Sequence, residues 1–254
     1  MLKVVDLSII IPAYNEERRL GETLEAILAY TARQPYSAEI IVVDDGSRDA
    51  TARLVAPLCD RKSRIQLLRN SSNRGKGFSV RRGFLRARGK YLLFSDADLS
   101  TPIEEVEKLL GLLRNGYDIA IGSRALPESR IEVRQPWHRQ HMGRLFNVLV
   151  QALVLRGIRD TQCGFKCFTR EAALDICRRM TRKRFAFDVE MLYLAEVMGY
   201  RVGEIPVVWR NSPETKVHVL RDSTSMFSDL LSIRWNRLRG RYDVRKTVTG
   251  EIAA

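Results

Sequence analysis

Short uninterrupted runs of apolar residues alternate with helical patterns along the first half of the chain. The runs "LSIII", "EIIVV", "RIQLL", "KYLLF" and "YDIAI" are too short for helices and rich in Val, Ile and Leu, so they predict five strands. Between the first two runs, Leu20, Leu24 and Ile27 recur at helical spacing. Continuous apolar strands separated by helices are typical of an α/β fold with a mostly parallel sheet flanked by helices, as in Rossmann-like proteins.

The second half of the chain has a different pattern. Residues 134–155 predict a helix that is first basic and then apolar, and "DTQCGFKCFTREAALDIC" predicts a loop or strand leading into a helix. "FAFDVEMLYLAEVMGY" predicts a helix, "RVGEIPVVWR" one strand, and "FSDLLSIRWNRLRGRY" a basic amphipathic helix. We expect one domain over 1–242, in which the alternating strands and helices of the first half (1–125) form a nucleotide-type binding surface and the second half (126–242) completes the fold, and a flexible tail (243–254).

Two carboxylates one residue apart follow the fourth apolar run. Asp96 and Asp98 repel each other, and a divalent cation such as Mg²⁺ or Mn²⁺, shared with phosphate oxygens, would relieve that repulsion. Ligands of open parallel sheets bind beyond the carboxyl ends of the strands, which is where this pair is expected. The alternative is a solvated turn or a helix cap.

Other polar groups follow the remaining strands. Asp44 and Asp45 end the second strand, where they could bind a base or ribose or cap the next helix. After the first strand and Pro12, Tyr14 could stack on a base while Asn15 or Glu16 orients it, and capping by Asn15 is the alternative. In "NRGKG", Lys76 and backbone N–H groups could face phosphate, although the spacing of a P-loop is absent.

Composition narrows the classes of partner. The chain has 254 residues, 45% of them hydrophobic, and a net charge of +13, which indicates a folded core and an anionic partner. We expect neither a signal peptide nor a transmembrane helix, because no run of eighteen apolar residues occurs. A zinc site built from His138, His141, Cys163 and Cys167 is less favoured than free thiols in a reducing compartment.

The motifs together resemble a known family. "IIIPAYNE", "VVDDGSRDAT", "NRGKG" and "SDAD", in this order, resemble the inverting family 2 glycosyltransferases with the GT-A fold. "GSRA", "RGIRDTQCGFKCFTREAA", "FAFDVEMLYLAE" and "EIPVVW" resemble the branch formed by the dolichyl-phosphate β-glucosyltransferases and their prokaryotic polyprenyl-phosphate relatives. The resemblance covers residues 6–242. Members of the family often carry a membrane anchor or transmembrane helices, which we expect this chain to lack.

The resemblance implies a site. The nucleotide sugar would be bound by Pro12, Tyr14 and Glu16 at the nucleobase and by Asp44 and Asp45 at uracil or ribose. Lys76 would lie near the nucleotide and Asp96 near ribose and diphosphate, and Arg124 and Gln162 would line the sugar pocket. Asp96 and Asp98 would hold the metal, and Asp98 and Asp188 would be the catalytic acids. For Asp188 and its neighbour Glu190, a helix cap and an exposed side chain are the alternative. Lys216 and Arg221 would clamp the acceptor phosphate, with a solvated loop as the alternative.

The expected activity is metal-dependent, inverting transfer of a hexose, in the first place glucose from UDP-glucose, to a polyprenyl or dolichyl phosphate. The alternatives are GDP-mannose as donor, a saccharide hydroxyl as acceptor, or a basic nucleic-acid-binding module. The last is disfavoured because acids crowd the predicted binding edge, so no nucleic-acid partner is expected.

A lipid acceptor implies peripheral binding to an anionic membrane on its cytoplasmic, inner face, and a homo-oligomer is also possible. Two apolar faces could bind it. The first face comprises Trp137, Leu145, Phe146, Val148, Leu149 and Leu153, and it is flanked by Arg134, Arg139 and Arg144. The second face comprises Leu230, Leu231, Ile233, Trp235 and Leu238, and it is flanked by Arg234, Arg237, Arg239 and Arg241. Packing against the core or a second copy is the alternative for the first face.

Overall fold

The computed structural model describes residues 5–59, 64–133, 137–155, 157–184, 186–211 and 219–242, without the side chains of 137–141, 144–145 and 219–227. Its strands lie in a sheet of seven, ordered β3-β2-β1-β4-β7-β5-β8, and a ribbon of two, β6 and β9. The bounds of the strands are β1 Val5–Ala13, β2 Ala38–Asp44, β3 Ile65–Arg69, β4 Gly89–Ser95, β5 Ile119–Ser123, β6 Arg130–Val133, β7 Phe165–Thr169, β8 Val202–Pro206 and β9 Val208–Arg210.

The sheet is mostly parallel, as the apolar runs predict. β1, β2, β3 and β4 pair in parallel, and so do β5 and β8. The exception is β7, which enters between β4 and β5 and is antiparallel to both. Because β7 runs the other way, its first residues lie at the edge where the parallel strands end.

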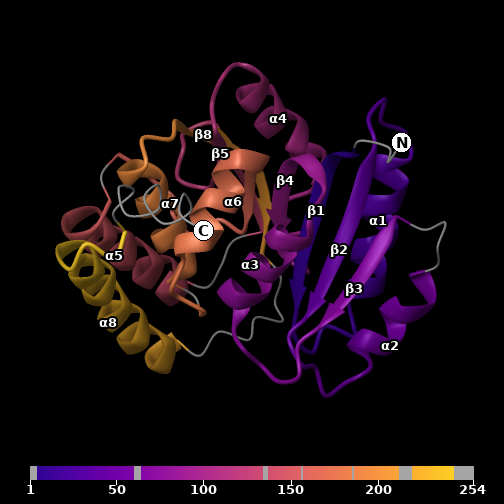
Figure 1. Cartoon of the computed structure of the whole chain (residues 1–254), viewed down its shortest axis with the longest axis horizontal. Coiled ribbons are helices and arrows are strands. Elements are labelled where there is room, and N and C mark those ends of the chain that lie inside the picture. The colour runs from indigo at the N-terminus through magenta and orange to yellow at the C-terminus, as the bar shows by residue number, and fades with distance from the viewer. Residues whose placement is uncertain are drawn as a thin grey trace, which may run out of the picture.

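Helices cover both faces of the sheet (Figure 1). Their bounds are α1 Leu20–Thr31, α2 Thr51–Val55, α3 Lys76–Arg86, α4 Val106–Arg114, α5 Trp137–Leu153, α6 Arg170–Arg179, α7 Phe187–Val197 and α8 Val219–Leu238, with short 3₁₀ turns at Ala56–Leu58 and Ile103–Glu105. Alternate residues of β1 point to opposite faces: Ile10 packs in the core with α3 and α5–α8, while Ile9 and Ile11 pack with α1, α2 and α4. Burial of the strands on both faces explains why their sequences are continuously apolar.

Two predicted elements are interrupted at or near a proline. The helix predicted over 49–59 consists of α2 followed by a 3₁₀ turn, and Pro57 lies in the first positions of that turn. The single strand predicted in "RVGEIPVVWR" is two strands, because the chain leaves the main sheet after Pro206 and pairs with β6 instead. Proline cannot donate a ladder hydrogen bond, so a strand end is a tolerated position for it.

Candidate functional site

The carboxyl ends of β1, β2, β4 and β5 meet at one edge of the sheet, and the start of β7 lies there too. Most of the predicted site residues lie at these strand ends or in the loops beside them, within the described part of the chain: Pro12, Tyr14, Glu16, Asp44, Asp45, Asp96, Asp98, Arg124 and Gln162. Lys76 begins α3, and Asp188 is in the first turn of α7. The structure therefore brings these predicted residues to the region where an open sheet binds ligands.

Asp96 is held by a lysine and by a close backbone contact. Its Oδ1 lies 2.6 Å from Nζ of Lys76, and its backbone N–H donates to the carbonyl oxygen of Gly164 at 3.1 Å. A Cβ on Gly164 would lie 2.7 Å from Oδ1 of Asp96 and closer still to the rest of the carboxyl group. Position 164 is therefore glycine because the Asp96 side chain occupies the space above it.

Asp98 lies between a backbone donor and a cationic side chain. Its Oδ1 accepts from the backbone N–H of Ser100 at 3.0 Å, and a guanidinium nitrogen of Arg19 lies 3.5 Å from Oδ2. Burial, and then the charge of Asp96, raise the pKa of Asp98 above its ordinary value. Two neighbouring carboxylates supply the oxygen ligands that a hard divalent cation prefers, so the residues present fit Mg²⁺ or Mn²⁺.

Asp188 is buried beside this pair. Its Oδ1 accepts from Nζ of the fully buried Lys166 at 2.6 Å. Burial raises the pKa of Asp188, while the charges of Lys166 and Lys76 oppose the rise. Burial also opposes the charge of Lys76, but Asp96 and Asp188 outweigh it and the pKa of Lys76 is raised. The cap predicted as the alternative for Asp188 is wrong, because the N-cap residue of α7 is Ala186 and no side chain caps this helix.

Asp45 organises the loop that leads into α3. Its carboxylate accepts from the backbone N–H of Arg74 at 2.9 Å and of Gly75 at 2.8 Å, and from Nδ2 of Asn70 at 2.6 Å. Asp44 accepts from the backbone N–H of Ser47 at 3.0 Å and from a guanidinium nitrogen at 3.1 Å. Neither carboxylate caps α2, whose first residue instead donates to Asp49.

The loop after β1 is fixed to the loop after β2. Asn15 has a positive φ of 55°, its backbone N–H donates to Oγ of Ser47 at 2.9 Å, and its Oδ1 accepts from the backbone N–H of Arg48 at 2.9 Å. Asn15 therefore links the two loops rather than capping α1. The Glu16 carboxylate is paired with the Arg19 guanidinium, so Arg19 connects this loop to Asp98.

Arg124 is clamped by an acid that follows in the chain. Both Asp160 oxygens accept from its guanidinium, at 2.7 and 2.8 Å, and the guanidinium lies 5.5 Å from the centre of the Trp209 ring. This pairing, set against burial, lowers the pKa of Asp160 to about 2. Asp160 also accepts from the backbone N–H of Gln162 at 3.2 Å. The two residues predicted for the sugar pocket are thus joined through one carboxylate.

Some predicted residues lie outside the described part of the chain: Arg134, Lys216, and the side chains of Trp137, His138, Arg139, His141, Arg144, Leu145 and Arg221. On α5, Phe146 and Leu149 pack against the core, whereas Val148 is exposed. The described residues contain no group of three or more His, Cys, Asp or Glu arranged for a metal, and all four cysteines are free thiols. No helix among them is long and apolar enough to cross a membrane.

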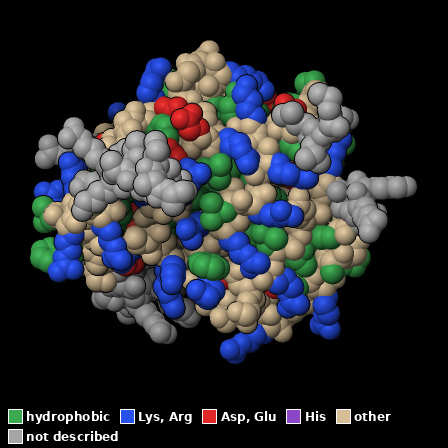
Figure 2. All heavy atoms as spheres, viewed as in Figure 1, with side chains coloured by type: hydrophobic (Ala, Val, Ile, Leu, Met, Phe, Trp, Pro, Cys, Tyr) green, Lys and Arg blue, Asp and Glu red, His purple; other side chains and the backbone are tan. Residues whose placement is uncertain are grey.

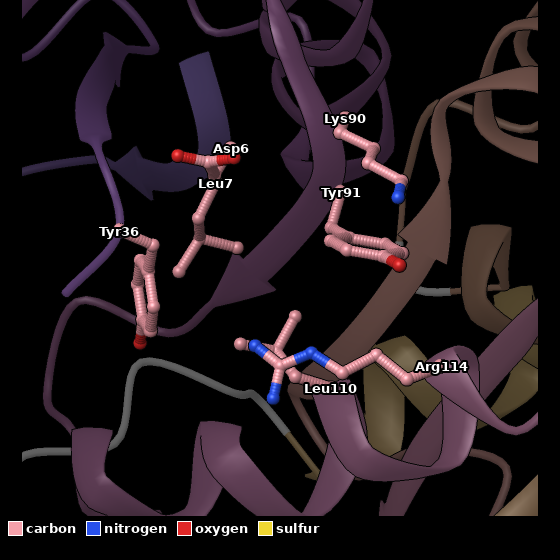
Figure 3. Close-up of a pocket in the computed structure, with 7 residues that line it drawn as sticks. All are labelled: Asp6, Leu7, Tyr36, Lys90, Tyr91, Leu110 and Arg114. Carbon is pink, nitrogen blue, oxygen red and sulfur yellow. The ribbon is translucent and has the colours of Figure 1, made fainter. Parts of the chain in front are cut away.

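The cavity drawn in Figure 3 lies at the opposite edge of the sheet. Leu7 and Leu110 form its floor, with Tyr36, Lys90 and Arg114 among the other lining residues. Asp6 and Tyr91 complete the lining, near the starts of β1 and β4. This cavity is therefore not continuous with the acid cluster.

Two important buried charges were not predicted. Lys166 lies in a segment that the sequence predicts as a loop or strand. A lysine inside the apolar run "GFKCF" is itself a signal of a paired buried charge. The exposed side chain given as the alternative for Glu190 is wrong, because Glu190 is fully buried. Its carboxylate accepts from the backbone N–H and hydroxyl of Thr181, the backbone N–H of Arg182 and the hydroxyl of Tyr242.

Known proteins resemble this chain over most of its length. The family model described as "Glycosyl transferase family 2" matches residues 8–177. The dolichyl-phosphate beta-glucosyltransferase of Dictyostelium discoideum is 38% identical over 251 residues, covering 94% of this chain and 77% of that protein. The Homo sapiens protein of the same name is 37% identical over 254 residues, covering 95% of this chain and 78% of its own length.

A solved structure of the Mycobacterium tuberculosis glucosyl-3-phosphoglycerate synthase has a TM-score of 0.66 at 17% identity, covering 96% of this chain and 82% of that one. Another structure of that protein, in complex with Mn²⁺, UDP-glucose and phosphoglyceric acid, has a TM-score of 0.64 at 17% identity and covers 92% of this chain and 79% of its own.

Proposed function

Because the chain belongs to glycosyl transferase family 2 and has the GT-A fold, we propose that it transfers glucose from UDP-glucose to a polyprenyl or dolichyl phosphate, with inversion at the anomeric carbon. The observation that carries the proposal is the cluster of Asp96, Asp98, Lys76 and Asp188 at the carboxyl edge of the sheet. It combines carboxylate oxygens for a cation with a lysine for a phosphate. Relatives that bear the name dolichyl-phosphate beta-glucosyltransferase support this choice of donor sugar and acceptor.

On the donor side, the nucleotide lies across the ends of β1, β2 and β4. Tyr14 and Glu16 flank the base, Asp44 contacts uracil or ribose, and Asp45 fixes the loop that brings Lys76 to the diphosphate. Asp96 and Asp98 would hold a divalent cation, whose charge would neutralise the leaving diphosphate. The neighbour's complex with Mn²⁺ and UDP-glucose supports this assignment by fold alone.

On the acceptor side, an oxygen of the lipid phosphate attacks the anomeric carbon on the face opposite UDP. The new C–O bond forms as the bond to the diphosphate oxygen breaks, and its electron pair leaves with UDP. The second pKa of such a phosphate is about 6, so the nucleophile is anionic at neutral pH and needs little help from a base. Asp188 therefore orients groups, and we expect Asp188→Asn to lower kcat about 100-fold without abolishing transfer.

The test is turnover of radiolabelled UDP-glucose, UDP-galactose and GDP-mannose with a short polyprenyl phosphate as acceptor. We expect chloroform-extractable label from UDP-glucose in the presence of Mn²⁺. Label from GDP-mannose alone would favour the mannosyltransferase alternative, and label only with a saccharide acceptor would replace the lipid. No transfer from any of these donors would refute the proposal.

The acceptor is a lipid, so we also propose that the chain docks on an anionic membrane leaflet through α8. Leu230 and Ile233 are buried in the core, which leaves Leu231, Trp235 and Leu238 on the outer face at 50%, 54% and 74% exposure. Exposed arginines surround this outer face of α8: Arg234, Arg237, Arg239 and Arg241. Figure 2 shows hydrophobic and basic side chains together at the side of the molecule where Figure 1 places α5 and α8.

An apolar stripe bordered by arginines is suited to an anionic lipid interface. Flotation with vesicles of phosphatidylserine and phosphatidylcholine tests this part of the proposal. Trp235→Ser should weaken the association, whereas Leu54→Ser, at a similarly exposed leucine on α2, should not. Equal loss in both variants, or no flotation of the wild type, would contradict docking through α8.

A further inference from the structure

A lysine lies in the middle of the sheet. Lys166 of β7 is paired with Phe94 of β4 on one side and Ile121 of β5 on the other, and its side chain is fully buried. Nζ donates to Oδ1 of Asp188 at 2.6 Å and to the carbonyl oxygen of Cys163 at 2.5 Å. A buried ammonium group is costly unless it is paired and hydrogen-bonded, and these two contacts meet that need.

Stability alone is a poor reason to keep such a pair. Replacing a buried ion pair by well-packed apolar residues is often neutral or stabilising, whereas removing one partner is strongly destabilising. The pair, however, adjoins the site. Nζ of Lys166 and Nζ of Lys76 lie 5.6 and 5.1 Å from the centre of the same Phe94 ring, and Lys76 in turn contacts Asp96 at 2.6 Å. Burial raises the pKa of Asp188, and the charges of both lysines oppose this rise.

We propose that Lys166 is a positioning residue for the transfer reaction, which fixes the Asp188 carboxylate in one orientation beside Lys76 from inside the sheet. The inference rests on the proposed function, because it concerns the same site. It assigns a role to a side chain that itself touches neither donor nor acceptor.

Charged side chains of alternating sign run from the sheet to the site. The series consists of Lys166, Asp188, Lys76 and Asp96. Without Lys166, the Asp188 carboxylate would keep one cationic neighbour, Lys76, and would compete with Asp96 for it. Asp188 would then leave the position from which it orients the acceptor, and Lys76 would be drawn from the diphosphate. Both displacements act on kcat.

A double-mutant cycle between Lys166→Met and Asp188→Asn tests the proposal. If Lys166 acts through Asp188, Lys166→Met, Asp188→Asn and the double variant should each lower kcat by about the same factor, on the order of 100-fold. Thermal denaturation should separate this from a structural role. Lys166→Met leaves an unpaired buried carboxylate and lowers Tm, whereas the double variant removes both charges and recovers Tm.

The cycle gives clear outcomes. If the double variant recovers kcat together with Tm, Lys166 is structural only and the proposal is overturned. It is also overturned if Lys166→Met keeps wild-type kcat, or if the double variant is much slower than Asp188→Asn. If Lys166→Met alone does not fold, the comparison of kcat between the double variant and Asp188→Asn still tests the proposal.

Lys90→Met, at an exposed lysine on the opposite edge of the sheet, is the control and should behave as the wild type. The outcomes remain distinct from failure of the proposed function. If the proposed function is wrong, the wild type itself transfers label from none of the three donors.

Discussion

Replacing Gly164 by alanine should disable the site while leaving the fold intact. The added Cβ would lie 2.7 Å from Oδ1 of Asp96 and closer to the rest of its carboxyl group. Non-bonded carbon and oxygen atoms require about 3.5 Å, so the carboxylate must move by about 1 Å or more. That movement breaks the 2.6 Å contact between Asp96 and Lys76 and displaces an expected cation ligand. Misplacement on this scale costs about 100-fold in rate, so we expect kcat/KM to fall by about that factor.

Steady-state transfer assays and calorimetric titration with UDP and Mn²⁺ measure the loss. Gly111→Ala is the matched control, since a Cβ at that position of α4 meets nothing within 4 Å. It should leave kcat/KM unchanged and stabilise the helix by about 0.5–1 kcal/mol. The double variant Gly164→Ala/Asp96→Ala should be no slower than Asp96→Ala. Wild-type kcat/KM in Gly164→Ala would refute the assignment of Asp96 to the site.

Three further outcomes follow from the same contacts. Asp98 has a raised pKa in the folded chain, so its ionised form opposes folding above that pKa; Asp98→Asn should raise the Tm of the metal-free protein at pH 7, and the difference should vanish as pH falls below about 4. Glu190→Ala should lower the free energy of unfolding by about 3 kcal/mol or more in urea titrations, because buried donors of Thr181, Arg182 and Tyr242 lose their acceptor; a Tyr242→Phe variant should lose only about 1 kcal/mol. Removal of divalent ions with a chelator should stop transfer, and Mn²⁺ should restore it; activity that persists in the chelator would count against a cation at Asp96 and Asp98.

The sequence predicts the fold well where the signal is local. Continuous apolar runs identify β1, β2, β4 and β5 because both faces of these strands are largely buried, and they identify β3 although this edge strand is only partly buried. Strand order then places the polar ends together. The position of β7 could not be predicted in this way, because no local sequence pattern indicates that a strand from the second half pairs with β4 and β5. The antiparallel insertion therefore follows only from the tertiary structure.

The same division applies to the candidate site. Asp96 and Asp98 are recognisable from their spacing after a strand, and the family resemblance adds Arg124 and Asp188. The partners of these residues are remote in the chain, so the pairing of Lys166 with Asp188 could not be read from periodicity. The exposed alternative for Glu190 fails for a related reason, because its partners are remote in the chain or in a loop: Thr181, Arg182 and Tyr242, which follows α8, all contact its carboxylate.

The insertion of β7 also bears on how this enzyme could be divided or recombined. A fragment that ends near residue 125 would leave β4 and β5 without the strand that joins them, exposing two apolar edges at the centre of the sheet. In a chimaera that takes its first half, up to about residue 125, from another homologue, β7 must therefore still pair with the exchanged β4 and β5. A junction placed between β5 and β7 would combine strands of two homologues within one ladder.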